Sequence, residues 1–351
     1  MKKQCIIFVT VLCGFFLLLA TPMICISAEN KIYIGSHIIK QNPGEFEKEL
    51  KVMEDIGMDI VRVSLFWQAA EPKKGSYQWD GYDEMVNLAK KHNIEILFTI
   101  KAISPWGSSN PSDLGKRGYH FSSPPKNMED YENFITNLIS HYKGKINYIQ
   151  IENEPNAKAF WNGTIQEYIT LLQAAYKAAK KANPDIKVLS AGLACGASRP
   201  KAITYGIDDY LDMARQVIKS HSFDIFDIHN YFPIDIEGTP YPITFANLID
   251  RINKILKEEN ANVPIWLSEV GIPGKTFKFP KGIKPYQSDE KRQSKDLISL
   301  TKTSRDKGVK AIFWLKIFDS EEGLFSDMGL LYGNGKKKKA YNTLKAIITK
   351  Q

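Results

Sequence analysis

The chain contains 351 residues, 43% of them hydrophobic and 25% charged, and it carries a formal net charge of +8. This composition is ordinary for a soluble globular protein, and the length allows either two or three domains or one large barrel. No basic stretch interleaved with aromatic residues accompanies the positive charge, so the sequence predicts no nucleic-acid partner.

The first 28 residues have the layout of a secretory signal peptide. Two lysines near the start precede an almost entirely apolar run, residues 6–20, and small residues stand at Ser27 and Ala28. The run is shorter than the roughly 20 residues that a membrane-spanning helix needs, so cleavage near Ala28 is favoured over an uncleaved anchor. We expect a secreted or extracytoplasmic protein without stable membrane insertion after cleavage, and one catalytic domain over residues 29–351.

Beyond this segment, apolar runs rich in β-forming residues alternate with longer amphipathic stretches. The runs predict strands at 31–38, 59–66, 95–100, 148–154, 187–193, 223–231, 264–270 and 311–318. The stretches predict helices at about 44–56, 80–92, 129–142, 164–182, 205–220, 243–259, 289–307 and 338–349. Near-continuous apolar strands are typical of a parallel sheet that is covered on both faces.

The alternation of strands and helices predicts an α/β fold. The loop lengths favour a single (β/α)8 barrel, a TIM barrel, over an open doubly wound sheet. Connections from helix to strand are short, whereas those from strand to helix are long, notably at 101–128, 232–242, 271–288 and 319–337. Long loops after the carboxyl ends of the strands build the active-site face of such a barrel. The segment after the first strand, GSHIIKQNPG, is not the glycine-rich phosphate turn of a nucleotide-binding doubly wound fold.

Polar residues that end the predicted strands are the candidates for chemistry, because these ends converge on one mouth of a barrel. The fourth strand ends with Asn153 and Glu154, and the seventh ends with Glu269. Two carboxylates that face each other across a barrel suit glycoside hydrolysis, in which one is protonated to help the leaving group depart and the other is ionised. Further strand-end candidates are Arg62, His229, Tyr231 and Trp314.

Motifs for other chemistries are missing from the sequence. The six histidines are scattered without an HExxH or HxH spacing, so we expect neither a metal nor an organic cofactor. There is no GxSxG for a serine hydrolase. Three of the four cysteines would leave with the signal peptide, and the remaining Cys195 can form no intramolecular disulfide.

The sequence resembles the clan A glycoside hydrolases, the retaining β-glycosidase superfamily on a (β/α)8 barrel, and within it families 39, 5 and 42, family 39 most of all. The stretch IENEPN resembles the clan's strand-4 signature, IWLSEVG its strand-7 nucleophile segment, and WQAAEPKKGSYQWDGYDEMV the segment after strand 2. The resemblance covers roughly residues 32–348.

This resemblance implies a role for each strand-end candidate. Glu154 would be the general acid/base and Glu269 the nucleophile. The other implied roles are contact with the sugar 2-hydroxyl for Asn153, support of the nucleophile for Arg62 and Tyr231, membership of the same network for His229, and a sugar platform for Trp314.

Aromatic residues in the long loops are candidates for stacking on sugars. The preferred substrate-binding candidates are Trp67, Trp106 and Trp161, because they follow directly after predicted strands. Packing inside the loops is the alternative for each of them.

Glu152 departs from the clan, which commonly carries an aromatic residue at this position. On a regular strand its side chain would share the barrel interior with Glu154, where an unpaired charge is costly. We hypothesise that Glu152 pairs with Lys101 or Lys316. A solvent-facing glutamate on an already irregular strand is the alternative.

The sequence therefore predicts an exported retaining β-glycoside hydrolase that cleaves a β-linked oligo- or polysaccharide by double displacement, with endo-action preferred. Two alternatives remain open: a carbohydrate-binding barrel without turnover, and an exo-acting β-glycosidase such as a β-xylosidase. The sugar, the linkage and the oligomeric state are left open.

Overall fold

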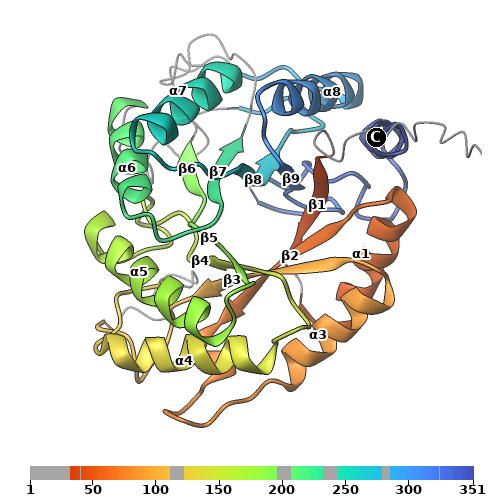
Figure 1. The fold of residues 1–351 in the computed structure, drawn as a ribbon. Helices are drawn as coiled ribbons and strands as arrows, with labels where there is room; N and C mark the ends of the chain where they lie inside the picture. The colour runs from red at the N-terminus through yellow and green to blue at the C-terminus, as the bar shows by residue number, and fades with distance from the viewer. Residues whose placement is uncertain are drawn as a thin grey trace, which may run out of the picture. The chain divides into compact units, whose positions relative to one another are not determined.

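Nine parallel strands form one curled sheet, and helices surround it (Figure 1). The computed structural model describes residues 32–39, 41–110, 122–195, 207–231, 244–278, 285–323 and 325–351. The predicted signal peptide lies outside these residues. The strands are β1 (Tyr33–Ile38), β2 (Ile60–Phe66), β3 (Glu95–Lys101), β4 (Tyr148–Ile151), β5 (Lys187–Leu189), β6 (Leu193–Cys195), β7 (Phe226–Tyr231), β8 (Ile265–Gly271) and β9 (Ala311–Trp314).

The sheet closes on itself through a single short segment of chain. Its order is β5-β4-β3-β2-β1-β9-β8-β7-β6, so its two ends, β5 and β6, are separated by only three residues. β5 pairs with β4, β6 pairs with β7, and Leu189 of β5 also bridges Ile225 just before β7. The expected (β/α)8 barrel is confirmed, and the fifth predicted strand, 187–193, is divided into two pieces.

The helices that were expected between the strands are present. They are α1 (Pro43–Ile56), α3 (Asp80–Lys91), α4 (Met128–His141), α5 (Ile165–Ala182), α6 (Ile207–Lys219), α7 (Phe245–Glu258), α8 (Glu290–Asp306) and α9 (Lys339–Ile348). A single-turn helix, α2 (Trp67–Ala70), follows β2 and was not expected from the sequence. Within the described residues, no helix is both long and apolar enough to span a bilayer.

Local sequence explains where the best-defined helices begin and end. The Thr164 side chain accepts a hydrogen bond from the Glu167 N–H, and the Glu167 side chain accepts one from the Thr164 N–H, which makes a capping box before α5. At the start of α1 the Asn42 side chain accepts a hydrogen bond from the Glu45 N–H, and α1 ends at Gly57, whose φ of 88° suits a residue without a Cβ.

The barrel interior is filled in layers. At the amino-terminal ends of the strands an apolar layer closes the barrel, formed by Ile60, Leu97, Leu189, Ile225, Trp266, Ala311 and Phe313. Because side chains alternate across a strand, the residue two positions further along each strand also points inward. At that level stand polar residues, including Arg62 on β2, Thr99 on β3 and Ser268 on β8, all at most 1% exposed.

Candidate active site

A glutamine near the barrel axis organises the polar interior. Gln150 on β4 accepts hydrogen bonds through Oε1 from Arg62 Nε at 2.9 Å and from the Thr99 hydroxyl at 2.7 Å. A guanidinium can only donate, so the orientation of the Gln150 amide is fixed. Its Nε2 therefore donates, to Asp227 Oδ2 and to the Ser190 carbonyl oxygen.

The first of the two candidate carboxylates, Glu154, follows an irregular end of β4. The strand ends at Ile151, and Glu152 and Glu154 adopt φ values of 69° and 46°. Non-glycine residues rarely adopt this left-handed region, and when they do it is often at functional sites. The prediction of a regular strand through 154 was wrong because this turn ends the pairing after Ile151.

The turn anchors Glu154 against the neighbouring strands of the barrel. Its N–H donates to the Gly192 carbonyl oxygen at 3.1 Å, and its Oε1 lies 3.0 Å from His229 Nδ1. The side chain is almost buried, with the residue 6% exposed. Glu154 is thus held where β4 meets the break between β5 and β6.

The second candidate carboxylate, Glu269, lies in β8 and receives donors from two sides. Arg62 Nη1 donates to Oε2 at 2.9 Å, and the Tyr231 hydroxyl donates to Oε1. The β7–β8 register shifts next to His229, which is the kind of irregularity that re-aims side chains near active sites. A cation and a hydroxyl donor therefore both contact the Glu269 carboxylate, one at each oxygen.

The two carboxylates and a histidine ring face one another. One oxygen of Glu154, one oxygen of Glu269 and a ring nitrogen of His229 all lie within 4.8 Å of each other. Burial, together with the nearby Arg62 and Lys101, lowers the pKa of His229 to about 3, against the opposing effect of Glu269. His229 is therefore neutral at ordinary pH, with one nitrogen that donates and one that accepts.

The remaining polar candidate also reaches this centre. Asn153 Oδ1 accepts from Arg62 Nη2 at 2.6 Å, so Arg62 connects Asn153, Gln150 and Glu269. The structure therefore brings together Glu154, Glu269, Arg62, Asn153, His229 and Tyr231.

The tryptophan candidates do not line this centre as platforms. Trp67 is 0% exposed and packs against Trp106 and Tyr131, and Trp161 is 1% exposed and packs against Tyr168. The expectation that Trp67 and Trp161 stack on sugars does not hold in this structure, because neither ring has a free face.

The two other tryptophans also make internal contacts. Trp106 is half-buried, and its indole N–H donates to the Glu71 carbonyl oxygen at 2.9 Å. Trp314 is 2% exposed, and its indole N–H donates to the Met328 carbonyl oxygen at 2.9 Å. Contact of either ring with a substrate stays a prediction.

Glu152 is paired inside the protein. It is 0% exposed, and Lys101 Nζ lies 3.6 Å from its Oε2. The Ala102 and Asn153 N–H groups also donate to its carboxylate. Of the two hypothesised partners Lys101 is the one in contact, because Lys316 instead bonds the Ser320 hydroxyl at 2.7 Å. The solvent-facing alternative is wrong.

Four further residues lie at the site: His37, which is partly exposed, and the buried Gln150, Asp227 and Ser268. His37 on β1 lies 3.3 Å from Arg62 Nη1 and 3.7 Å from Glu269 Oε2. Burial raises the pKa of the Asp227 carboxyl to about 7, against the opposing effects of Ser268, Arg62 and Gln150. In the sequence, Asp227 alternates with His229, and Ser268 stands next to Glu269 at a strand end. The same inward alternation, followed back from Glu152, is the signal for Gln150.

The cluster of Glu154, His229 and Glu269 has a spacing that three ligands of one ion could also have. Its contacts favour proton chemistry instead. The Arg62 guanidinium already neutralises Glu269, and His229 Nδ1 is engaged by Glu154. A second cation at this point would face the positive charge of Arg62.

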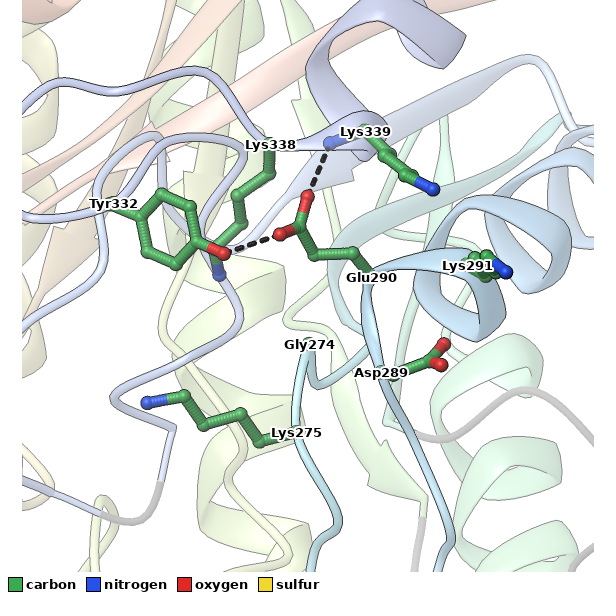
Figure 2. A pocket seen from close by; sticks show the side chains of 8 residues that line it. All are labelled: Gly274, Lys275, Asp289, Glu290, Lys291, Tyr332, Lys338 and Lys339. Atoms are coloured by element: carbon green, nitrogen blue, oxygen red, sulfur yellow. Dashed lines mark hydrogen bonds between the residues drawn. The ribbon is translucent and has the colours of Figure 1, made fainter.

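A separate pocket of about 340 Å³ lies near the start of α8, and neither Glu154 nor Glu269 lines it. Figure 2 shows Glu290 between Tyr332 and Lys339, hydrogen-bonded to the Tyr332 hydroxyl and to the Lys339 N–H. The residues that line the pocket are Gly274, Lys275, Asp289, Glu290, Lys291, Tyr332, Lys338 and Lys339. These contacts tie α8 to the start of α9.

Comparisons with known proteins find similar sequences and similar folds. The model of glycosyl hydrolase family 10 matches residues 25–196. Endo-1,4-beta-xylanase A of Phanerodontia chrysosporium is 29% identical over 130 residues, covering 36% of this chain and 30% of the xylanase. A beta-xylosidase of Caldicellulosiruptor saccharolyticus is 26% identical over 198 residues, covering 53% of this chain and 38% of the xylosidase. The aligned part is thus about a third of the length of these curated relatives.

A solved structure extends the likeness to the whole barrel. A family 39 glycoside hydrolase from Bacteroides cellulosilyticus WH2 superposes with a TM-score of 0.69 at 19% identity, covering 92% of this chain and 64% of that one. The sequence matches and the barrel make this chain similar to the clan A glycoside hydrolases: residues 25–196 match the model of family 10, and the fold is similar to that of family 39.

Proposed function

We propose that this chain is an exported retaining enzyme that hydrolyses β-glycosidic bonds by double displacement. The observation that carries the proposal is the spacing of Glu154 and Glu269, whose nearest oxygens lie within 4.8 Å. Retaining glycosidases hold their two carboxyl groups roughly 5–5.5 Å apart, whereas inverting ones leave roughly 6.5–9.5 Å for a water molecule. The spacing supports retention. Export is supported by the amino-terminal sequence alone.

The proposed reaction has two steps. Glu269, held in place by Arg62 and Tyr231, attacks the anomeric carbon as the carboxylate while Glu154 transfers its proton to the glycosidic oxygen. The leaving sugar departs, and a glycosyl ester forms on Glu269. A water molecule then gives a proton to Glu154 and attacks the same carbon from the face that the leaving group vacated. The sugar is released with its original anomeric configuration, and both carboxyl groups return to their starting states.

The proposed substrate is a β-linked oligo- or polysaccharide, and β-1,4-linked xylose chains are the first to test. Support comes from the relatives, which include endo-1,4-beta-xylanases and a beta-xylosidase. The xylanase matches support endo-action, and the β-xylosidase match supports the exo-acting alternative. Product sizes on xylohexaose separate the two, because exo-action releases single xylose units from the start.

The test combines a panel of aryl β-glycosides with three variants. We expect wild type to release phenol from at least one glycoside, and product NMR to show the retained anomer first. Glu269→Gln should lose at least about 10⁴-fold in kcat because it lacks the nucleophile. Glu154→Gln should lose far more on poor leaving groups than on activated ones, because only the former need protonation. Glu84→Gln, on the exposed face of α3, is the matched control.

Two results would contradict the proposal. An inverted first product would exclude double displacement. A wild type that is inert on every glycoside yet binds xylan in an affinity gel would favour the carbohydrate-binding barrel without turnover.

A further inference from the structure

Behind His229 lies a buried chain of hydrogen bonds that the reaction above does not use. His229 Nε2 lies 3.0 Å from the Ser268 hydroxyl, and that hydroxyl donates to Asp227 Oδ2. On the other side of the ring, Nδ1 lies 3.0 Å from Glu154 Oε1. Asp227, Ser268 and His229 are each 0% exposed. A continuous path therefore runs from Glu154 to a second carboxyl group on β7.

The direction of these hydrogen bonds is set at the Asp227 end. The Ser268 N–H donates to Asp227 Oδ1 at 2.9 Å, and the Gln150 amide donates to Oδ2. Neither donor can be reversed, because one is a backbone N–H and the other is held by Arg62. Both favour the ionised carboxylate at Asp227, which leaves it only accepting hydrogen bonds.

The ionised carboxylate of Asp227 then decides which atom is the donor in each of the remaining hydrogen bonds. Beside an ionised Asp227 the Ser268 hydroxyl must donate to the carboxylate, so its oxygen accepts from His229 and the ring proton sits on Nε2. His229 Nδ1 then presents a lone pair to Glu154 Oε1. A hydrogen bond between two acceptors requires a proton, and the proton has to sit on Glu154.

We propose that Asp227 and Ser268 are positioning residues that hold His229 in its Nε2–H tautomer and thereby keep the general acid Glu154 protonated at mildly alkaline pH. This deepens the proposed function and rests on it for the role of Glu154. When Glu154 gives its proton to the leaving group, the lone pair of His229 opposes the new negative charge. The carboxylate is then a stronger base for the water of the second step.

Other charged groups near these hydrogen bonds affect the pH range in which Asp227 is ionised. The titratable and charged groups that interact with His229 or Asp227 include Arg62 on β2, Lys101 at the end of β3, Glu154, Glu269 on β8, His37 on β1 and Tyr168 on α5. Within the described residues, His229 Nε2 lies 3.0 Å from the Ser268 hydroxyl and 3.7 Å from Asp227 Oδ2. Burial raises the pKa of Asp227 only to about 7, so the carboxylate form that orients the path is populated above that pH.

The first test reads the tautomer directly at pH 8 and needs no substrate. In protein labelled with ¹⁵N-histidine, the His229 resonances are assigned by their loss in His229→Gln. We expect wild type to show a protonated Nε2 and an unprotonated Nδ1. In Asp227→Asn the amide NH₂ donates to Ser268, the hydroxyl turns to donate to His229, and the proton moves to Nδ1. A wild type with its proton on Nδ1, or an unchanged tautomer in Asp227→Asn, would overturn the proposal.

The second test reads the consequence for catalysis. In Asp227→Asn and in Ser268→Ala, the high-pH limb of kcat/KM should move to lower pH by on the order of one unit, a loss of about tenfold at pH 8. The loss should be larger for a poor leaving group than for an activated one. Ser190→Ala is the matched control, because the Ser190 hydroxyl accepts the Asp227 N–H at 3.0 Å but does not contact its carboxylate. If the high-pH limb of kcat/KM shifts equally in Ser190→Ala, the shift comes from a general structural change and contradicts the proposal.

The two tests separate this inference from the proposed function. If wild type is inert on all glycosides but shows the expected tautomer, the function fails and the path stands. If wild type is an active retaining enzyme with the opposite tautomer, the path fails and the function stands. If Asp227→Asn does not fold, the His229 tautomer of wild type and the pH dependence of kcat/KM in Ser268→Ala still test the inference.

Discussion

At the residue scale, the site depends on a glycine that leaves room for its side chains. A Cβ added to Gly192 would lie 2.1 Å from His229 Cδ2 and 2.7 Å from Asp227 Oδ2. Real Cβ atoms do not approach so closely, so the ring or the backbone would have to move. Gly192 also accepts the N–H of Glu154 through its carbonyl oxygen. The closing segment between β5 and β6 is therefore shaped by the histidine beside it.

We predict that Gly192→Ala lowers both activity and stability. Overpacking against His229 should lower the free energy of unfolding by about 1–3 kcal/mol. The value of kcat should also fall, because a displaced His229 ring no longer contacts the Glu154 carboxyl group. Urea denaturation and aryl glycoside kinetics measure the two effects. Gly81→Ala is the control, since nothing lies within 4 Å of its added Cβ and it stands in the first turn of α3. Equal behaviour of the two variants would contradict the packing argument.

The Glu152–Lys101 pair gives a second prediction at this scale. Glu152→Gln keeps the shape but leaves Lys101 as an uncompensated buried cation, so we expect the free energy of unfolding to fall by about 3–5 kcal/mol. Burial lowers the pKa of Lys101, against the opposing effect of Glu152, so loss of the lysine proton limits the damage as pH rises.

Thermal unfolding at pH 7 and pH 9.5 measures this effect. The double variant Glu152→Gln, Lys101→Met removes both charges and should recover most of the lost stability. A double variant as unstable as Glu152→Gln alone would show that the charge pair is not the cause.

At the element scale, the strands that form the barrel were readable from sequence and their irregular ends were not. Runs such as 95–100 and 264–270 are short, mostly apolar and rich in β-forming residues, which is typical of a covered parallel strand. The left-handed turn at Glu152 and the break at Gly192 depend on contacts with other strands. No local pattern in 148–154 or 187–193 encodes those contacts.

The candidate site divides in the same way. Glu154 and Glu269 could be predicted because a carboxylate at a buried strand end needs a reason. Asp227 and Ser268 were missed as a path because each is an ordinary residue until the β7–β8 pairing sets it beside His229. Trp67 was misjudged because the one-turn helix α2 turns it into the core.

A cap prediction also belongs to the element scale. Thr164→Ala removes one half of the capping box before α5 and should lower the free energy of unfolding by about 1 kcal/mol. Thr170→Ala, at an exposed position in the middle of the same helix, should be neutral or slightly stabilising because alanine is the better helix former. Urea titration of both variants provides the comparison, and an equal loss in both would contradict the cap.

At the scale of the whole molecule, an acid-sensitive contact holds the last helix to the barrel wall. Hydrogen bonds from the Tyr332 hydroxyl and the Lys339 N–H lower the pKa of Glu290, against a small opposing effect of burial (Figure 2). A lowered carboxyl pKa stabilises the fold above the unfolded value of about 4.5, and this stability is lost as pH falls through the folded value.

We therefore predict that Glu290→Gln changes the acid limb of the stability curve. Wild type should lose more melting temperature than the variant between pH 6 and pH 3.5, and the two should converge at the acid end. Differential scanning fluorimetry across this range measures the difference. Parallel curves with a constant offset would show that the contact acts without its charge.

The closure of the sheet at residues 187–195 has a consequence for how activity arises. The chain up to β5 supplies Arg62, Asn153 and Glu154, while the chain from β6 onward supplies His229, Tyr231 and Glu269. Neither half of the ring holds a complete reaction centre. During refolding, turnover should appear only once both seams, β1 with β9 and β4 with β7 through the 187–195 segment, have joined. The onset of glycoside cleavage during refolding would then report when the barrel closes. It should come later than the recovery of the helical circular dichroism signal.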